Sequence, residues 1–572
     1  MTLKIVMRLL LFTLLILPLL FSGCGLRDQP VIVSGKDIDV ANAMVVSAHP
    51  EASRIGAGVM AAGGNAVDAA VAVEYALAVC YPTAGNIGGG GFMVVRLADG
   101  TTDAIDYREK APSAAHRDMY LDSTGNVIEG LSLDTHLSAG VPGTVDGTLY
   151  AHSLYGKLSL ERIIQPAIDL AVNGFPLTAS QAASLNGMRE TFIQRNDRPV
   201  AFVRDLPWRE GDTLRQPELG ETLKRIRDNG REGFYEGETA DMLIAECAGG
   251  NGIITPDDLR EYRSVSRDPL ETNYRGYKVI SMPPPSSGGI LLAQLLTMTE
   301  MTSRVTDSFM RPSTMHLMAE AERRAFADRA HFLGDPDFTD IPVAGLLNKE
   351  YLSQRTADID PERATPSSTV THGTVTYNES EETTHYSVVD ALGNAVAGTT
   401  TLNNSYGTAI VVRGAGFILN DQMDDFSVKP GTPNLYGLIG GEANAVAPGK
   451  RMLSSMTPTI IEKEGSLFMV LGSPGGSTII TTVFQVIRNV IDFGMGIYDA
   501  VAAPRFHHQW IPDVISYEAG TLDSLIITEL KSMGHQLSPR GAIGRADAIM
   551  IGADGRRYAG ADPRGDDTAA GW

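Results

Sequence analysis

The sequence TTHYSVVD, residues 383–390, decides the fold that we expect for this chain. Residues 384–389 alternate in the manner of a half-buried strand, residues 390–394 form a turn, and residues 395–402 supply a partner strand. The preceding stretch, 361–382, is rich in Ser, Thr, Pro and Glu and has no apolar period, so we predict an exposed, mobile segment there. A flexible segment that runs straight into a buried strand leaves the peptide bond at their junction accessible to cleavage.

The predicted hairpin brings two threonines together at one of its ends. Centring the turn on Leu392 places Thr383 opposite Thr401. A threonine at a new chain terminus carries its own amine beside its hydroxyl, and this arrangement activates a weak nucleophile without a histidine base. The alternative is that both threonines are ordinary β-branched strand residues, and the spacing alone leaves both interpretations open.

Other elements are expected around this hairpin. The pattern over residues 52–79 is helical with a break at Gly63-Gly64, and Asn65 is a good N-cap for the second half. Strands with helices on both sides in the sequence indicate a layered α/β fold. The remaining predictions are strands over 92–95, 407–412, 416–419, 458–461 and 467–471, and a helix over 477–492.

Composition and charge exclude several classes of protein. Of 572 residues, 43% are hydrophobic and 20% are charged, which provides a large core and excludes global disorder. The formal net charge of −21 leaves no basic surplus, so nucleic acid is not expected as a partner. The motifs G-x-S-x-G, H-E-x-x-H and Cys-x-x-Cys do not occur. The adjacent His507 and His508 point apart on any regular element, so we expect no shared metal there.

An export signal precedes the folded part. Two basic residues are followed by an apolar run over residues 9–21, which is shorter than the ~20-residue helix that spans a bilayer. The sequence Ser22-Gly23-Cys24 resembles the lipobox of bacterial lipoproteins. This resemblance implies a signal peptide of residues 1–23, a lipid on Cys24, a tether over residues 24–40, and a location on the periplasmic side of the cell envelope, with the outer membrane favoured. The alternative is an ordinary cleaved signal.

Long motifs in both halves of the chain carry a second resemblance. The first half contains GGNAVDAAVA, IGGGGFMVV, DYREKAP, GVPGTV, FLGDPDF and MPPPSSGG, and the second contains TTHYSVVD, GNAVAGTTTLN, GAGFILNDQMDDFS, PNLYGLIGGEANAVAPGKRMLSSMTPTI, GSPGGSTIITTV and APRFHHQW. From about residue 40 to the C-terminus the chain resembles the gamma-glutamyltransferase (gamma-glutamyltranspeptidase/glutathione hydrolase) family of N-terminal nucleophile hydrolases. The resemblance implies a four-layer α-β-β-α sandwich built jointly by a large subunit, 41–382, and a small subunit, 383–572, which arise by self-cleavage of one precursor.

The same resemblance assigns roles to residues at matching positions. It makes Thr383 the nucleophile and Thr401 the hydroxyl that assists it. Gly475 and Gly476 would form the oxyanion hole, and their place just before a predicted helix supports this, because unpaired N–H groups and the positive helix end converge there. The substrate-binding residues implied are Arg108, Ser454 and Ser455 for an α-carboxylate, Asn403, Gln422 and Asp425 for an α-ammonium, and a lid loop over 430–441 with Tyr436.

The implied activity is acyl transfer from γ-glutamyl compounds. Glutathione and related γ-glutamyl compounds would be the donors, and water, amino acids or peptides the acceptors, with no metal or organic cofactor. One alternative keeps the fold and changes the substrate, as in cephalosporin or glutaryl acylases. Another is an uncleaved, inactive lipoprotein that only binds γ-glutamyl peptides.

The lipid anchor is directly testable. Because the apolar run ends at the lipobox-like sequence, we expect the mature wild-type protein to carry lipid on Cys24 and to sediment with membranes. The Cys24→Ala variant should lose the lipid and leave the membrane fraction. Mass analysis of the mature protein, together with cell fractionation, checks both outcomes. A wild-type protein that is soluble and unlipidated contradicts the prediction.

Overall fold

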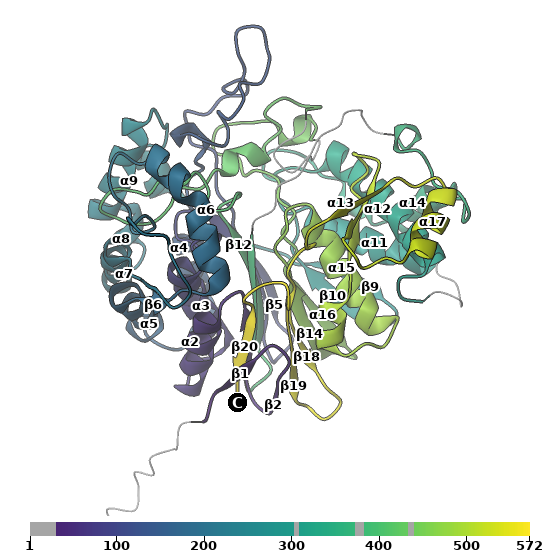
Figure 1. The fold of residues 1–572 in the computed structure, drawn as a ribbon, viewed down its shortest axis with the longest axis horizontal. Coiled ribbons are helices and arrows are strands. Elements are labelled where there is room, and N and C mark those ends of the chain that lie inside the picture. Colours follow the sequence, from purple (N-terminus) through teal and green to yellow (C-terminus); the bar gives the residue numbers. More distant parts are fainter. Residues whose placement is uncertain (1–29, 303–307, 372–382, 433–439) are drawn as a thin grey trace, which may run out of the picture. The chain divides into compact units, whose positions relative to one another are not determined.

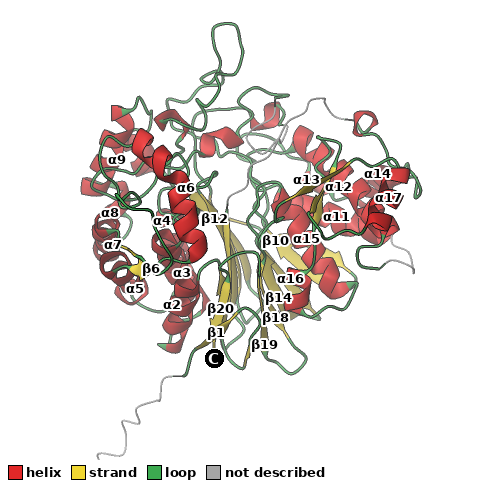
Figure 2. Ribbon diagram, viewed as in Figure 1, coloured by secondary structure: helices red, strands yellow, loops and turns green. Residues whose placement is uncertain are grey.

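The computed structural model describes residues 30–302, 308–371, 383–432 and 440–572. Residues 32–572 form one compact unit in which two stacked sheets lie between two layers of helices (Figures 1 and 2). The α-β-β-α sandwich expected from the sequence is therefore confirmed. Cys24, Tyr436 and residues 372–382, for which the sequence made specific predictions, lie outside the described residues.

The first sheet has eight strands among the described residues, and every pairing in it is antiparallel. In spatial order these strands are β1 (Val33–Gly35), β20 (Thr568–Gly571), β3 (Met44–Ser47), β11 (Thr384–Val389), β12 (Ala395–Thr401), β4 (Gly90–Arg96), β5 (Thr102–Tyr107) and β8 (Val265–Arg267). Strands that follow residue 383 in the chain, β20, β11 and β12, thus lie between strands that precede it.

The second sheet has seven strands in the described part of the chain and is also antiparallel. In spatial order they are β2 (Asp39–Val40), β19 (Arg557–Ala561), β18 (Asp547–Ile551), β14 (Ser466–Gly472), β13 (Thr459–Lys463), β10 (Tyr277–Ser281) and β9 (Leu270–Tyr274). Strands from both sides of residue 383 again share one sheet, so each sheet needs both parts of the chain.

Helices cover the outer face of each sheet (Figure 2). On the first sheet they are α2 (Pro50–Ala61), α3 (Ala66–Cys80), α4 (Thr144–Tyr155), α5 (Leu160–Asn173), α6 (Ala179–Arg195), α7 (Pro217–Asn229), α8 (Glu232–Tyr235), α9 (Gly237–Gly249) and α10 (Pro256–Glu261). On the second sheet they are α11 (Gly288–Thr302), α12 (Pro312–Phe332), α13 (Val343–Leu346), α14 (Lys349–Thr356), α15 (Thr478–Ile491), α16 (Ile497–Ala502) and α17 (Ser524–Ser532). Small sheets at the periphery comprise β6 (Phe175–Pro176) with β7 (Thr213–Leu214), and β15 (Phe506–His507) with β16 (Ile515–Glu518) and β17 (Leu537–Arg540). None of the described helices is long and apolar enough to cross a membrane.

Alternation along the strands builds the layers. Val45 packs with the helices on the outer face of the first sheet, whereas its neighbour Val46 packs between the two sheets. Met93 and Val94 divide in the same way. This is the period of two expected for a strand with apolar groups on both faces. The hydroxyl of Ser387 also joins the layers, because it donates to the carbonyl of Asp547 at 3.0 Å.

Several local predictions are confirmed. The α3 helix begins after Asn65, whose side chain accepts from the N–H of Asp68 while Asp68 accepts from the N–H of Asn65, and this forms a capping box. The helix α15 begins one residue after Ser477, its N-cap. The hairpin register is also as expected, since Thr384 pairs with Thr400 and Val389 with Ala395.

The strands predicted over 407–412 and 416–419 are wrong. A single bridge, Val411 to Ile418, stands in their place. The backbone of Ala409 has a φ of 58° and that of Gly407 a φ of 49°, so the chain turns where an extended conformation was expected.

Residues 361–371, the described part of the segment predicted to be exposed, are mostly exposed or half-buried, but Ser367 and Val370 are buried. Within residues 361–371, a 3₁₀ turn at Ser367–Thr369 buries Ser367. The N–H of Ser367 donates to Asp513 at 2.7 Å, and its carbonyl accepts from the indole of Trp510 at 3.1 Å. Hydrogen bonds to residues distant in the sequence hold this stretch in place, and the pattern of apolar residues gives no indication of such contacts.

Two glycine substitutions should shift stability in opposite directions. Gly398 pairs with Tyr386 across β11 and β12, and an added Cβ would lie 2.2 Å from the buried tyrosine ring. We expect Gly398→Ala to lower stability on the order of 1–3 kcal/mol or more through overpacking. The control is Gly58→Ala in α2, where an added Cβ meets nothing within 4 Å. It should raise stability by about 0.5–1 kcal/mol. Thermal unfolding measures the stability of both variants, and a shift in the same direction for both would contradict the expected difference in packing.

Candidate active site

A small cavity opens at the edge of the first sheet where β5 and β12 end and β11 begins. It contains nearly every residue that the sequence singled out. The lining residues are Arg108, Arg329, Thr383, Thr401, Asn403, Gln422, Asp425, Ser454, Ser455, Met456, Gly476 and Ile479. Of the predicted site residues that the structure describes, Gly475 alone is absent from this lining. The structure thus brings the predicted residues together, and their individual roles remain predictions.

The two threonines stand at the same end of the hairpin. Thr383 immediately precedes β11 and is almost fully buried, and Thr401 is the last residue of β12. The N–H of Asn403 donates to the Thr401 hydroxyl oxygen at 2.9 Å. Asn403 has a φ of 80°, a left-handed conformation that asparagine tolerates better than most residues. This turn fixes the Thr401 hydroxyl and directs the chain away from the strand.

None of the described residues that line the cavity is a histidine. The histidine nearest in sequence, His385, is fully buried within β11 and hydrogen-bonds to the hydroxyls of Thr399 and Ser387 at 2.8 and 3.1 Å. Burial lowers the pKa of His385 to about 3, so its ring is neutral at neutral pH. A general base for Thr383 therefore has to come from another group.

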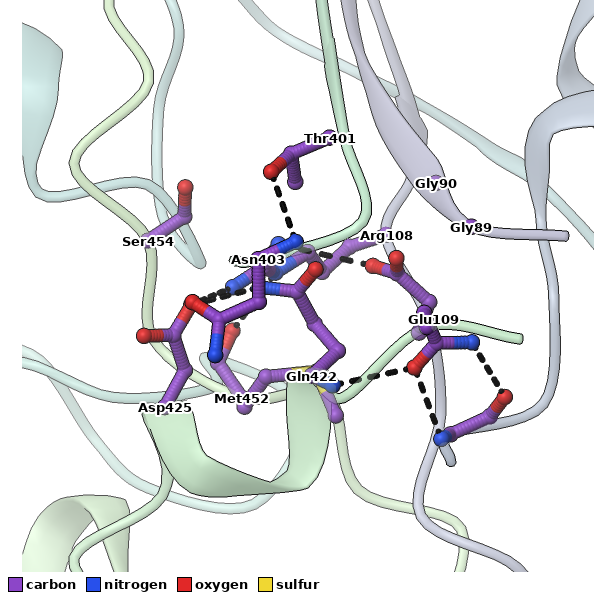
Figure 3. Close-up of polar contacts among 12 residues, drawn as sticks. Gly89, Gly90, Arg108, Glu109, Thr401, Asn403, Gln422, Asp425, Met452 and Ser454 are labelled. Carbon is purple, nitrogen blue, oxygen red and sulfur yellow. Dashed lines mark hydrogen bonds and ion pairs between the residues drawn. The ribbon is translucent and has the colours of Figure 1, made fainter. Parts of the chain in front are cut away.

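Arg108 is completely buried directly after β5. Its guanidinium donates to the backbone carbonyls of Met452 and Leu453, each at 3.3 Å. It also forms an ion pair with Asp425 (Figure 3). The side-chain N–H of Gln422 donates to the same carboxylate oxygen of Asp425 at 2.7 Å.

This ion pair refines the prediction for the charged residues. From the sequence, Arg108 and Asp425 were expected to bind the two opposite charges of one ligand. In the structure they also bind each other. A zwitterionic ligand that contacts both residues must break the ion pair between Arg108 and Asp425 and form one ion pair with each of them.

Glu109 is a site residue that the sequence analysis missed. It is completely buried on the other side of Arg108, whose guanidinium lies 3.4 Å from its carboxylate (Figure 3). Its second oxygen has no hydrogen-bond partner among the described residues. Burial raises the pKa of Glu109 to about 7, while Arg108 acts in the opposite direction. The charged sequence DYREK at a strand end was the available signal.

The glycine pair links β14 to α15. Gly475 and Gly476 have φ values of 130° and 53°, in the region that favours glycine. Gly476 lines the cavity beside Thr383, two residues before the first residue of α15. The positive end of that helix therefore lies near the proposed nucleophile.

Arg329 is the second residue that the sequence analysis missed. It belongs to α12 and is 5% exposed. A charged residue on a long helix is normally solvated, so its sequence position gave no signal of a cavity.

Among the described residues, one group has metal-ligand spacing, and it lies outside this cavity: His316, Glu320 and His535. The two rings hydrogen-bond to each other at 2.8 Å. Glu320 accepts from Arg323 and Arg324 and from the N–H of Thr365. Hydrogen bonds between protein groups therefore explain why these three side chains lie close together. His507 and His508 face different partners, Thr481 and Asp513.

The comparison with known families identifies the chain. The model of the family described as gamma-glutamyltranspeptidase matches residues 52–572. The chain belongs to this family. The match includes β5, the hairpin and the turn before α15, so all the residues that line the cavity belong to the matched region.

The chain is similar to a curated protein and to two solved structures, two of these three over nearly its whole length. It is 46% identical over 562 residues to the glutathione hydrolase proenzyme of Escherichia coli (strain K12), covering 96% of this chain and 97% of that one. Cephalosporin acylase from Bacillus halodurans superimposes with a TM-score of 0.81 at 25% identity, covering 96% and 99% of the two chains. Helicobacter pylori gamma-glutamyltranspeptidase gives a TM-score of 0.56 at 45% identity, covering 57% of this chain and 94% of that one.

Glu109 should make stability depend on pH in a defined direction. Its pKa is about 7 in the folded protein against an ordinary value of 4.5, so the folded state holds this proton more tightly. Its contribution to stability therefore falls as the pH rises from about 4.5 to about 7 and is constant above that.

The Glu109→Gln variant isolates this effect. It should match the wild type in stability at pH 5 and exceed it at pH 8 on the order of 3 kcal/mol. Thermal unfolding of both proteins across this range checks it. A stability difference that does not change with pH would contradict the assignment.

Proposed function

We propose that this member of the gamma-glutamyltranspeptidase family is a glutathione hydrolase and γ-glutamyl acyltransferase that uses Thr383 as its nucleophile. The single observation that carries the proposal is the cavity itself. It combines a hydroxyl at a strand terminus, a buried guanidinium and a carboxylate. A γ-glutamyl donor has the complementary groups, namely an α-carboxylate, an α-ammonium and, farther along, the carbonyl that is attacked.

The first chemical step breaks the γ-glutamyl amide bond. The Thr383 hydroxyl oxygen forms a bond to the γ-carbonyl carbon, and its proton goes to the threonine's own amine, since none of the described residues that line the cavity is a histidine. The carbonyl oxygen becomes an oxyanion beside Gly476, where backbone N–H groups and the positive end of α15 stabilise it. The carbon–nitrogen bond then breaks, and the leaving amine takes the proton from the threonine amine.

The second step releases the acyl group. The intermediate is an ester between the γ-glutamyl group and Thr383. Water attacks this ester in hydrolysis, and the amine of an amino acid or peptide attacks it in transfer. In both cases the attacking group loses a proton to the Thr383 amine, and the ester bond between the acyl carbon and the threonine oxygen breaks. The amine then passes the proton to this oxygen, which restores the threonine hydroxyl.

The substrate-binding groups favour a γ-glutamyl donor over the acyl group of a cephalosporin or glutaryl substrate. Arg108 suits a carboxylate because its planar fork donates two parallel hydrogen bonds. Asn403, Gln422 and Asp425 line the same cavity and carry acceptor oxygens, and an acyl group that lacks an α-ammonium does not need all of them. The acylase alternative therefore has the weaker support.

The free amine requires cleavage before Thr383, so we propose that the chain is a precursor that cuts itself into segments 41–382 and 383–572. These parts are interleaved in both sheets and would remain together as a heterodimer. We further propose export to the periplasmic side of the envelope and a lipid anchor at Cys24. Only the N-terminal sequence supports this location.

Self-cleavage gives the first test of function. The wild type should yield two pieces, the smaller of 190 residues when cut before residue 383 of 572. Thr383→Ala should remain one chain, because the hydroxyl that attacks the preceding peptide bond is gone. A denaturing gel with mass analysis measures this. If the alanine variant is fully cleaved, Thr383 does not process the chain, and an uncleaved wild type favours the inactive binding protein.

Substrate recognition gives the second test. Arg108→Ala leaves Asp425 without its partner in a buried site, a loss typically of about 2–5 kcal/mol, or on the order of 30- to 5,000-fold. The loss should appear in kcat/KM for glutathione hydrolysis by the cleaved enzyme. Arg108→Lys should restore only part of it, because lysine lacks the planar fork. Wild-type kcat/KM in cleaved Arg108→Ala would show that the carboxylate is held elsewhere and would favour the acylase alternative.

A further inference from the structure

Arg329 places a second buried guanidinium in the cavity. It projects from α12, is 5% exposed, and lines the same space as Thr383 and Arg108. Its two hydrogen bonds go to neutral hydroxyls, from Nε to Ser287 at 3.0 Å and from Nη2 to Ser455 at 3.3 Å. Across the described parts of the chain, no carboxylate forms an ion pair with it. A buried cation without an ion-pair partner is costly unless an anion comes to it.

The charges around Arg329 indicate what that anion is. Burial lowers the pKa of Arg329 to about 10, so it is still charged at neutral pH. Asp425 attracts it from a distance and Arg108 repels it. Asp425 is already paired with Arg108. The cavity therefore has an excess of positive charge on the side of Arg329, which favours a ligand carboxylate there.

The hydrogen-bond directions connect Arg329 to both serines that we expect to hold a carboxylate. Ser455 accepts from Arg329 at its oxygen, so its own proton is available to donate to a ligand. Ser287 also accepts from Arg329, and it donates through its hydroxyl to the carbonyl of Ser454 at 2.7 Å. The N–H of Ser287 donates to the same carbonyl at 2.8 Å. One guanidinium thus fixes the Ser455 hydroxyl directly and the Ser454 backbone through Ser287.

We propose that Arg329 is a positioning residue for recognition of the donor α-carboxylate: it orients Ser455 and Ser454 and supplies the charge that stabilises the carboxylate bound to them. This inference rests on the proposed function, because it concerns the α-carboxylate of a γ-glutamyl donor. Arg108 would contact the carboxylate itself, and Arg329 would act through the serines. The effect should therefore appear as selectivity for the carboxylate, and the hydrolytic chemistry at Thr383 should not require it.

A pair of donors that differ only in the α-carboxylate tests the proposal. These are γ-glutamyl p-nitroanilide and 4-aminobutanoyl p-nitroanilide, and kcat/KM is measured for both with the cleaved enzyme. In Arg329→Met the kcat/KM for the γ-glutamyl donor should fall about 10- to 100-fold, the range for a lost hydrogen-bond contribution to a charged group. The kcat/KM for the 4-aminobutanoyl donor should change little. Arg329→Lys keeps the charge but cannot reach both serines, so its selectivity should be intermediate.

Two further variants separate positioning from general stability. Arg324 lies on the same helix, is equally buried, and pairs with Glu320 and Asp358 outside the cavity. Arg324→Met should lower the kcat/KM of both donors by the same factor, if it lowers either. Ser455→Ala should reduce selectivity in the manner of Arg329→Met. The double variant Arg329→Met/Ser455→Ala should be no less selective than the less selective of its two single variants, because Arg329 acts on the carboxylate through Ser455.

The outcomes are distinguishable. Equal losses on both donors in Arg329→Met, or unchanged selectivity, would overturn the positioning role. Should Arg329→Met fail to fold or to cleave, Ser455→Ala and Arg329→Lys decide the matter, since full selectivity in both would also overturn it. A correctly cleaved wild type that hydrolyses neither γ-glutamyl p-nitroanilide nor glutathione would instead reject the proposed function.

Discussion

The register between β11 and β12 is the constraint on which the site depends. Thr384 pairs with Thr400, and this pairing brings Thr383 and Thr401 to the same edge of the sheet. A shift of one residue would turn every side chain of β11 to the opposite face. Tyr386 would then leave the outer core, and Ser387 would lose its bond across the two sheets. The cores on both faces therefore fix the position of the proposed nucleophile.

The cavity next to this edge concentrates charge in a region that water scarcely reaches. Arg108 pairs with Asp425 and lies 3.4 Å from the Glu109 carboxylate, whereas Arg329, which lines the same cavity, forms no ion pair among the described residues. Burial raises the pKa of Glu109 to about 7, and a protonated carboxyl group costs less free energy to bury than a charged one. The backbone carbonyls of Met452 and Leu453 accept hydrogen bonds from the Arg108 guanidinium. Such an arrangement is expensive for folding and favourable for binding, because a ligand with complementary charges relieves it.

Local signals in the sequence predicted the elements that carry the site. Asn65 and Asp68 announced the start of α3, and the alternating stretch after Thr383 gave the hairpin in its correct register. Long matching motifs supplied the candidate substrate-binding residues, which the structure gathers in one cavity. Longer-range effects were out of reach. Residues 407–419 turn through left-handed conformations, and Ser367 is held by residues more than 140 positions away in sequence.

The two missed residues share one cause. Charged side chains are exposed in most proteins, so the sequence gave no reason to place Arg329 in a cavity, and DYREK marked Glu109 as part of a charged strand end without indicating its burial. Arg329 meets Ser455 across 126 positions of sequence. The burial of Arg329 follows from the packing of α12 against α11 in the helical layer beside the second sheet, and it is visible only once the layers are assembled.

The place of β20 in the first sheet has a consequence for biosynthesis. Residues 568–571 lie between β1 and β3, and β3 in turn flanks the strand that begins after Thr383. A nascent chain that has passed residue 383 still lacks this neighbour of β3 until almost two hundred further residues have been synthesised. If cleavage before Thr383 needs the completed sheet, it cannot take place during translation. With the export that we propose, the precursor would then cross the inner membrane as one uncut polypeptide and acquire its nucleophile only at its destination.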